Sequence, residues 1–150
     1  MNTIALRFSD NYAPKEGTIN LHNEVIKRKG FVWYGKFGSS ISKDIKEELL
    51  SLENPKILLI SSGTNKRFWA FIEDIKSEID ELDNVPNYYR NDANKIKCWF
   101  KIVKIEKADS NVMSNCYLRS THRPLSESSR HCMNPYFKIE FLPNKAEEEI

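Results

Sequence analysis

The positions of the helical patterns limit the possible folds of this chain most strongly. Apolar residues recur at helical spacing in two segments, residues 18–29 and 42–52, and both lie before residue 55. The other apolar runs are short, and they are alternating or rich in β-branched and aromatic residues, as is typical of strands. A doubly wound parallel sheet needs helices between strands along the whole chain, so this order excludes it.

The expected order of elements is therefore β-α-β-α-β-β-β-β. We predict strands at residues 3–8, 31–34, 57–61, 67–72, 97–105 and 136–142. Residues 73–82 fit either a helix or a strand followed by a loop, and residues 109–130 are irregular in pattern. The sequence predicts an α+β fold: a small curved mixed sheet or a partly open barrel, with the helices packed outside.

Length and composition indicate one globular domain. The chain has 150 residues, of which 40% are hydrophobic and 29% charged. We assign the domain to residues 1–142 and interpret residues 143–150 as a polar, acidic tail or linker. The longest apolar run, Ile57–Ile60, is too short to span a membrane, and the N-terminus lacks the apolar stretch of a signal peptide. We therefore expect a cytoplasmic protein without a membrane partner.

Residues that often carry metal or nucleophile chemistry show no recognised pattern. The three cysteines, Cys98, Cys116 and Cys132, are widely spaced and form no CxxC motif. His131 precedes Cys132, but no second pair stands at metal-ligand spacing. The chain contains neither a glycine-rich phosphate loop nor a GxSxG motif. We expect no metal, no cofactor and no catalytic residues.

Aromatic side chains give the strongest chemical signal. Most of them are expected in the core, including Phe31, Phe71, Phe100, Phe137 and Phe141. Tyr88 and Tyr89 differ because they lie in a polar loop beside Arg90, where core packing is less natural. Such rings suit stacking on a nucleobase, and the alternative is that they anchor their own loop. The net charge of +2 permits a nucleic-acid partner without requiring one.

Three segments, in this order, resemble the PUA-like superfamily and especially its YTH and EVE branches. The first is LRFSDN followed by a helix, Gly30 and FVWYG; the others are CWFKIVKI and CYLRSTHRPLSESSRH. Together they extend the resemblance over roughly residues 4–141. The resemblance implies a PUA-like fold and a nucleic-acid-binding module rather than an enzyme. It implies recognition of a modified, methylated base in an aromatic cage.

The resemblance also implies which residues hold the nucleic acid. Trp33 takes the place of a cage wall, and the loop with the tyrosine pair supplies the second wall. The implied base-binding residues are Trp33, Tyr34, Asp10, Asn23, Tyr88 and Tyr89. The implied phosphate-binding residues are Arg90, Arg119 and Arg130.

EVE-like domains often read DNA for modification-dependent restriction systems, so the resemblance implies DNA or RNA carrying a modified base as the ligand. It further implies a nuclease or motor subunit as a partner. One alternative is an ASCH-like hydrolase of the same superfamily, acting on a modified nucleoside or nucleic acid. Another is a protein-interaction domain whose pocket is filled. The sequence leaves these alternatives open.

Overall fold

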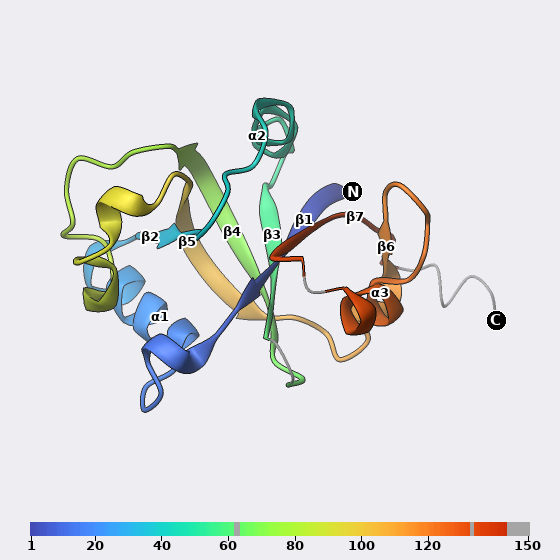
Figure 1. Cartoon of the computed structure of the whole chain (residues 1–150), viewed down its shortest axis with the longest axis horizontal. Helices are drawn as coiled ribbons and strands as arrows, with labels where there is room; N and C mark the ends of the chain where they lie inside the picture. Colours follow the sequence, from blue (N-terminus) through green and yellow to red (C-terminus); the bar gives the residue numbers. More distant parts are fainter. Residues whose placement is uncertain (62–63, 133, 144–150) are drawn as a thin grey trace. The chain divides into compact units, whose positions relative to one another are not determined.

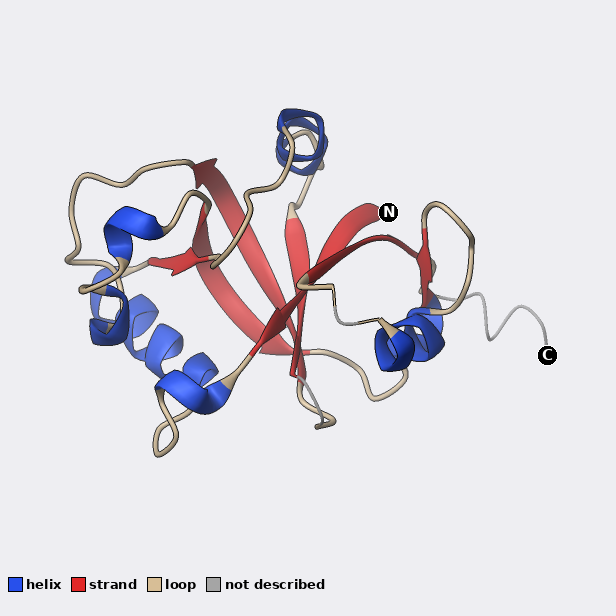
Figure 2. Ribbon diagram, in the orientation of Figure 1, coloured by secondary structure: helices blue, strands red, loops and turns tan. Residues whose placement is uncertain are grey.

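The chain forms seven strands and three α-helices in the part that the structure describes, residues 1–61, 64–132 and 134–143 of a computed structural model. The strands are β1 (Asn2–Phe8), β2 (Val32–Gly35), β3 (Lys56–Ser61), β4 (Arg67–Lys76), β5 (Trp99–Lys107), β6 (Cys116–Leu118) and β7 (Tyr136–Phe141). The α-helices are α1 (Thr18–Lys29), α2 (Lys43–Leu50) and α3 (Leu125–His131) (Figures 1 and 2). Short 3₁₀ turns lie between them, among them Asn87–Tyr89 and Ala93–Lys95.

All seven strands belong to one open, mixed sheet with the order β2-β5-β4-β3-β1-β7-β6. β1 is parallel to β3 and antiparallel to β7, and β2–β5 and β6–β7 are further antiparallel pairs. The parallel β1–β3 pair makes the sheet mixed, and the long connection between these two strands contains both early helices. The predicted α+β class with a curved mixed sheet is confirmed.

The chain divides into two compact units. Unit 1 consists of residues 1–8, 57–69 and the described residues from 106 on, and unit 2 of residues 9–56 and 70–105. The core of unit 1 forms where β1 pairs with β3, in a register that places Leu6 beside Leu59. The Ile57–Ile60 run of β3 is buried throughout, as a strand covered on both faces requires.

In unit 2 the two early helices follow the local signals of the sequence. α1 packs against β2 and ends at Gly30, whose left-handed backbone (φ 88°) closes the helix with an N–H bond to the Ile26 carbonyl. α2 begins after Ser42, whose hydroxyl accepts a hydrogen bond from the Ile45 N–H, and it buries Ile45 and Leu49. Both helices were predicted within three residues of their observed bounds.

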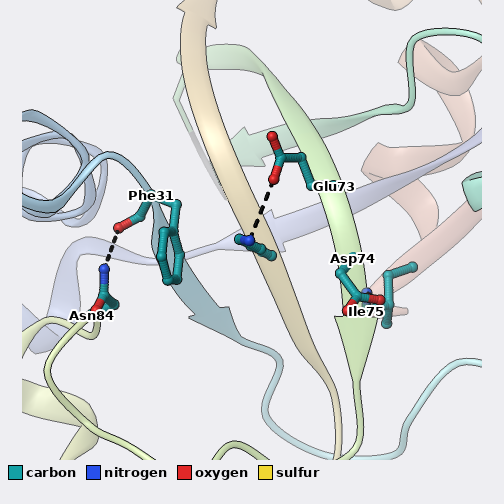
Figure 3. Close-up of polar contacts among 6 residues, drawn as sticks. Phe31, Glu73, Asp74, Ile75 and Asn84 are labelled. Atoms are coloured by element: carbon teal, nitrogen blue, oxygen red, sulfur yellow. Dashed lines mark hydrogen bonds and ion pairs between the residues drawn. The ribbon is translucent and has the colours of Figure 1, made fainter.

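The ambiguous segment 73–82 is a strand followed by a loop. β4 continues to Lys76, where the Asp74 carboxylate accepts a hydrogen bond of 2.8 Å from the Ile75 N–H. Glu73 pairs with Lys101 of β5 at 3.4 Å, and the Asn84 side-chain amide donates to the Phe31 carbonyl at 3.1 Å (Figure 3). The Asn84–Phe31 hydrogen bond holds the β4–β5 loop against the residue that precedes β2.

Two further expectations are wrong. The segment 109–130, predicted as irregular, contains β6 and most of α3. Of the five phenylalanines expected in the core, Phe100 and Phe137 are buried, whereas Phe31, Phe71 and Phe141 are only half-buried.

Residues 62 and 63 of the predicted turn and residues 144–150 of the predicted tail lie outside the described residues. Among the helices that the structure does describe, none combines the length and the apolarity needed to cross a bilayer.

Candidate functional site

Five rings from four parts of unit 2 meet in one cluster. We call His22, Tyr34, Tyr88, Tyr89 and Trp99 the ring cluster. The ring centroids of His22 and Tyr34 lie 4.8 Å apart, those of Tyr88 and Tyr89 4.4 Å apart, and those of Tyr89 and Trp99 5.5 Å apart. α1, β2, the β4–β5 loop and β5 each supply a member, so the cluster ties these elements together.

His22 is a neutral imidazole at the centre of this cluster. It is completely buried, and desolvation by burial lowers its pKa to about 4 although the hydrogen bond to Thr18 raises it. Nδ1 lies 2.7 Å from the Thr18 carbonyl oxygen, which can only accept, so Nδ1 carries the proton. Nε2 and the Gly35 carbonyl are acceptors at 3.4 and 3.3 Å from the Tyr89 hydroxyl.

Tyr89 is a core residue, although its polar neighbours in the sequence made core packing appear unnatural. Its side chain is 2% exposed, and burial raises the pKa of its hydroxyl well above the usual value. Gly35 permits this packing: a Cβ atom there would lie 2.8–3.0 Å from side-chain atoms of Ile96, Trp99 and Tyr89. Burial of Tyr89 agrees with the second of the two alternatives for this residue, a tyrosine that anchors its own loop.

The other predicted base-binding residues have different surroundings. Trp33 is 9% exposed and packs in a core group with Val85, Tyr89, Ile96 and Trp99. Asp10 accepts a hydrogen bond of 2.8 Å from the Thr18 N–H and so caps the first turn of α1. Asn23, the predicted base-binding residue on α1, is half-buried. The structure thus brings Tyr34, Tyr88 and Tyr89 together and places Asp10 at the helix terminus.

Unit 2 also contains a cavity of about 560 Å³, which we call the neutral cavity. Its apolar lining is Ile79, Leu82, Ala93, Ile96 and Trp99, and its polar lining is Glu78, Asp80, Arg90, Asn91, Asn94 and Lys97. The two carboxylates balance the two cations, and the volume lies within the usual range of ligand sites. Arg90, predicted to bind phosphate, lies here, whereas none of the predicted base-binding residues lines this cavity.

Unit 1 contains a cavity of about 460 Å³ with a very different charge, which we call the arginine cavity. Three arginines line it, and its described lining includes no carboxylate. Its described lining is Arg7, Ile60, Ser61, Thr64, Asn65, Arg67, Met113, Ser126, Ser129 and Arg130. Guanidinium, hydroxyl and amide groups together form a set of donors suited to an anion.

The three guanidinium groups differ in how firmly they are held. Nη2 of Arg7 donates to the carbonyls of Ser129 and Cys132, both at 2.6 Å, and Nε donates to the Asn134 carbonyl at 3.0 Å. These bonds tie β1 to the end of α3, where a positive charge is favourable. Arg67 has one long contact of 3.5 Å to the Asn65 carbonyl. Arg130 is exposed and forms no hydrogen bond or ion pair with a residue that the structure describes.

The predicted phosphate-binding residues therefore do not lie in one site. Arg130 lines the arginine cavity, Arg90 lines the neutral cavity, and Arg119 lines neither, although its backbone N–H bonds the Lys138 carbonyl. Sequence reasoning missed Arg7 and Arg67. No local signal marks them, because only the strand pairing brings together residues so distant in the chain.

Unit 2 contains two buried groups of the kinds used in acid–base and nucleophilic catalysis, the Lys36 ammonium and the Cys98 thiol. The Lys36 ammonium donates to the carbonyls of Ser39 and Phe37, and burial lowers its pKa. Burial raises the pKa of the Cys98 thiol, so the thiol is protonated at neutral pH. Within the described ranges, no three His, Cys, Asp or Glu residues are grouped to hold a metal ion.

The chain was compared with known families, curated proteins and solved structures. A family model described as Pua-like matches residues 4–139, which run from β1 into β7. No curated protein and no solved structure matches the chain. The family match covers far more than half of the chain and includes both cavities. The chain therefore belongs to the Pua-like family.

Proposed function

We propose that the chain is a nucleic-acid-binding module, and the arginine cavity is the observation that carries this proposal. Three guanidinium groups line one cavity without a carboxylate among its described residues. Arginine is suited to phosphate because its planar donors match two phosphate oxygens at once. Membership in the Pua-like family, which suggests nucleic-acid or modified-base binding, agrees with this function.

We assign the phosphate to unit 1 and the base to unit 2. The lining charges of the neutral cavity cancel, which suits an uncharged heterocycle better than a phosphate. Ile79, Leu82 and Ala93 of its lining are partly exposed and offer apolar surface, and Asn91 and Asn94 offer amide groups of the kind that pair with base edges. Trp33, the predicted cage wall, does not line this cavity, so the proposed base contact lies on different residues.

The proposed ligand is DNA or RNA with a modified base, as in the EVE and YTH branches. A methyl group buried against the apolar lining adds about 0.8 kcal/mol, which is about fourfold in affinity. Such a reader fits a modification-dependent restriction system, with a nuclease or motor subunit as its partner.

The phosphate assignment is tested by Arg130→Ala, because this side chain has no described partner and its loss leaves the fold intact. Fluorescence anisotropy with a labelled oligonucleotide at fixed low salt is expected to show binding weakened about tenfold or more, from lost charge-assisted hydrogen bonds. Arg123→Ala is the matched control, since this exposed arginine of unit 1 lies outside the cavity. Equal affinity of Arg130→Ala and the unchanged chain would contradict the proposal.

The base assignment is tested separately with methylated and unmethylated oligonucleotides of one sequence. Asn91→Ala combined with Asn94→Ala is expected to remove the preference for the methylated strand while affinity for the unmethylated strand persists. Lys95→Ala serves as control, because Lys95 pairs with Asp92 and does not line the cavity. A preference that survives the double substitution would contradict this assignment.

A further inference from the structure

We infer that the arginine cavity receives a terminal phosphate monoester, the phosphorylated end of a nucleic-acid strand, rather than an internal phosphodiester. This inference rests on the proposed function and adds the kind of phosphate group that the cavity selects.

Three guanidinium groups contribute a formal charge of +3 to the lining, and no described lining residue is acidic. An internal diester brings one negative charge, whereas a monoester brings about 1.5 to 2 at pH 7. Cations that share a partly desolvated cavity repel one another, and a ligand with more negative charge relieves this repulsion further. The charge of the lining therefore favours the monoester.

A monoester offers three terminal oxygens, while a diester offers only two unbridged ones. The three arginines come from three different elements, β1, β4 and α3, so their donors approach the cavity from separate walls. Ser126 and Ser129 add hydroxyls from one face of α3, being three residues apart on a helix. A monoester can present one of its three terminal oxygens to each guanidinium group, which matches this arrangement of donors.

The arginine cavity is partly preorganised for an anion. Arg7 is held by three bonds to backbone carbonyls and lies 5.4 Å from the centre of the Phe137 ring, so its guanidinium is fixed before a ligand arrives. Those three bonds use Nε and Nη2 and do not involve Nη1. Arg130, at the exposed side, has no described partner that it must release. One fixed and one adaptable arginine lower the cost of binding an anion.

The experiment compares single-stranded oligonucleotides of one sequence that end in a 5′-phosphate, a 3′-phosphate or hydroxyl groups only. Anisotropy titrations use the full chain at one salt concentration, with the label in the middle of the strand. At least one phosphorylated strand is expected to bind about tenfold tighter than the hydroxyl strand. The gain is expected to disappear in Arg130→Ala and to persist in Arg123→Ala.

The outcomes separate this inference from the proposed function. If all three strands bind equally and Arg130→Ala weakens all of them, the cavity holds an internal diester, and the inference is overturned while the function stands. If no strand binds, the proposed function itself fails. A nucleoside monophosphate is expected to displace the phosphorylated strand only at concentrations at least about tenfold higher than an unlabelled strand needs. Displacement at equal concentrations would overturn the assignment to strand ends.

Discussion

His22 makes the stability of this protein depend on pH. Its pKa of about 4 in the folded state compares with 6.5 in an unfolded chain, so the unfolded chain binds the proton first as the pH falls. The contribution of buried, neutral His22 to the free energy of unfolding is fully present above about pH 6.5. It decreases as the pH falls towards 4, by about 3 kcal/mol when both the folded and the unfolded states are protonated. Urea unfolding at a series of pH values from 8 to about 4 measures this loss.

The comparison with His22→Gln isolates this effect from the carboxylates that also titrate in acid. The variant is expected to be less stable at pH 7 but to lose less stability on acidification than the unchanged chain. His122→Gln is the control, because His122 is an exposed histidine outside the ring cluster. Parallel pH profiles for all three proteins would show that burial of His22 has no such cost.

Single residues also show which structural features could be predicted from the sequence. Gly30 and the basic run before it marked the end of α1, because only glycine enters the left-handed region there without strain. The sequence left the role of Tyr89 open because its burial depends on Gly35, which is distant in sequence and leaves room for its ring. Asp10 was assigned to a base by resemblance, whereas its carboxylate bonds the first turn of α1. Local rules capture helix ends, and they miss packing between distant segments.

Among the elements, α3 depends most on a single distant side chain. It has seven residues, buries only Leu125 and has no side-chain cap at its start. The Arg7 guanidinium bonds the carbonyls of Ser129 and Cys132 at its end. In Arg7→Lys a single ammonium group cannot reproduce these bonds together with the one to Asn134. Hydrogen exchange of the 125–132 peptide is therefore expected to become about 10- to 100-fold faster.

Arg123→Lys is the control for this measurement, since the Arg123 side chain is exposed in the same unit. Unchanged exchange in Arg7→Lys would mean that packing of Leu125 alone holds the helix. The same dependence explains why the sequence did not predict α3. Its one buried residue gives no apolar periodicity, and its serines favour turns, so the stabilising contact comes from the other end of the chain.

At the scale of the whole molecule, the net charge of +2 conceals two contrasting cavities. The lining of one is neutral, and the lining of the other carries three arginines and no described acid. The sequence predicted the fold class because strand and helix patterns are local. It identified only Arg130 in the arginine cavity, because strand order decides which arginines meet. Charge clustering in three dimensions, rather than total charge, is what supports nucleic-acid binding here.

This contrast predicts different salt dependences for substitutions in the two cavities. Each phosphate contact neutralised on a single strand contributes about 0.7 to the slope of log affinity against log salt concentration. Arg130→Ala is expected to reduce that slope by about this amount, because its cation lines the arginine cavity. Asn91→Ala, which removes an uncharged group of the neutral cavity, is expected to weaken binding of a modified strand with the slope unchanged. Titrations at four or more salt concentrations measure both slopes, and equal slopes for Arg130→Ala and the unchanged chain would show that phosphate binds elsewhere.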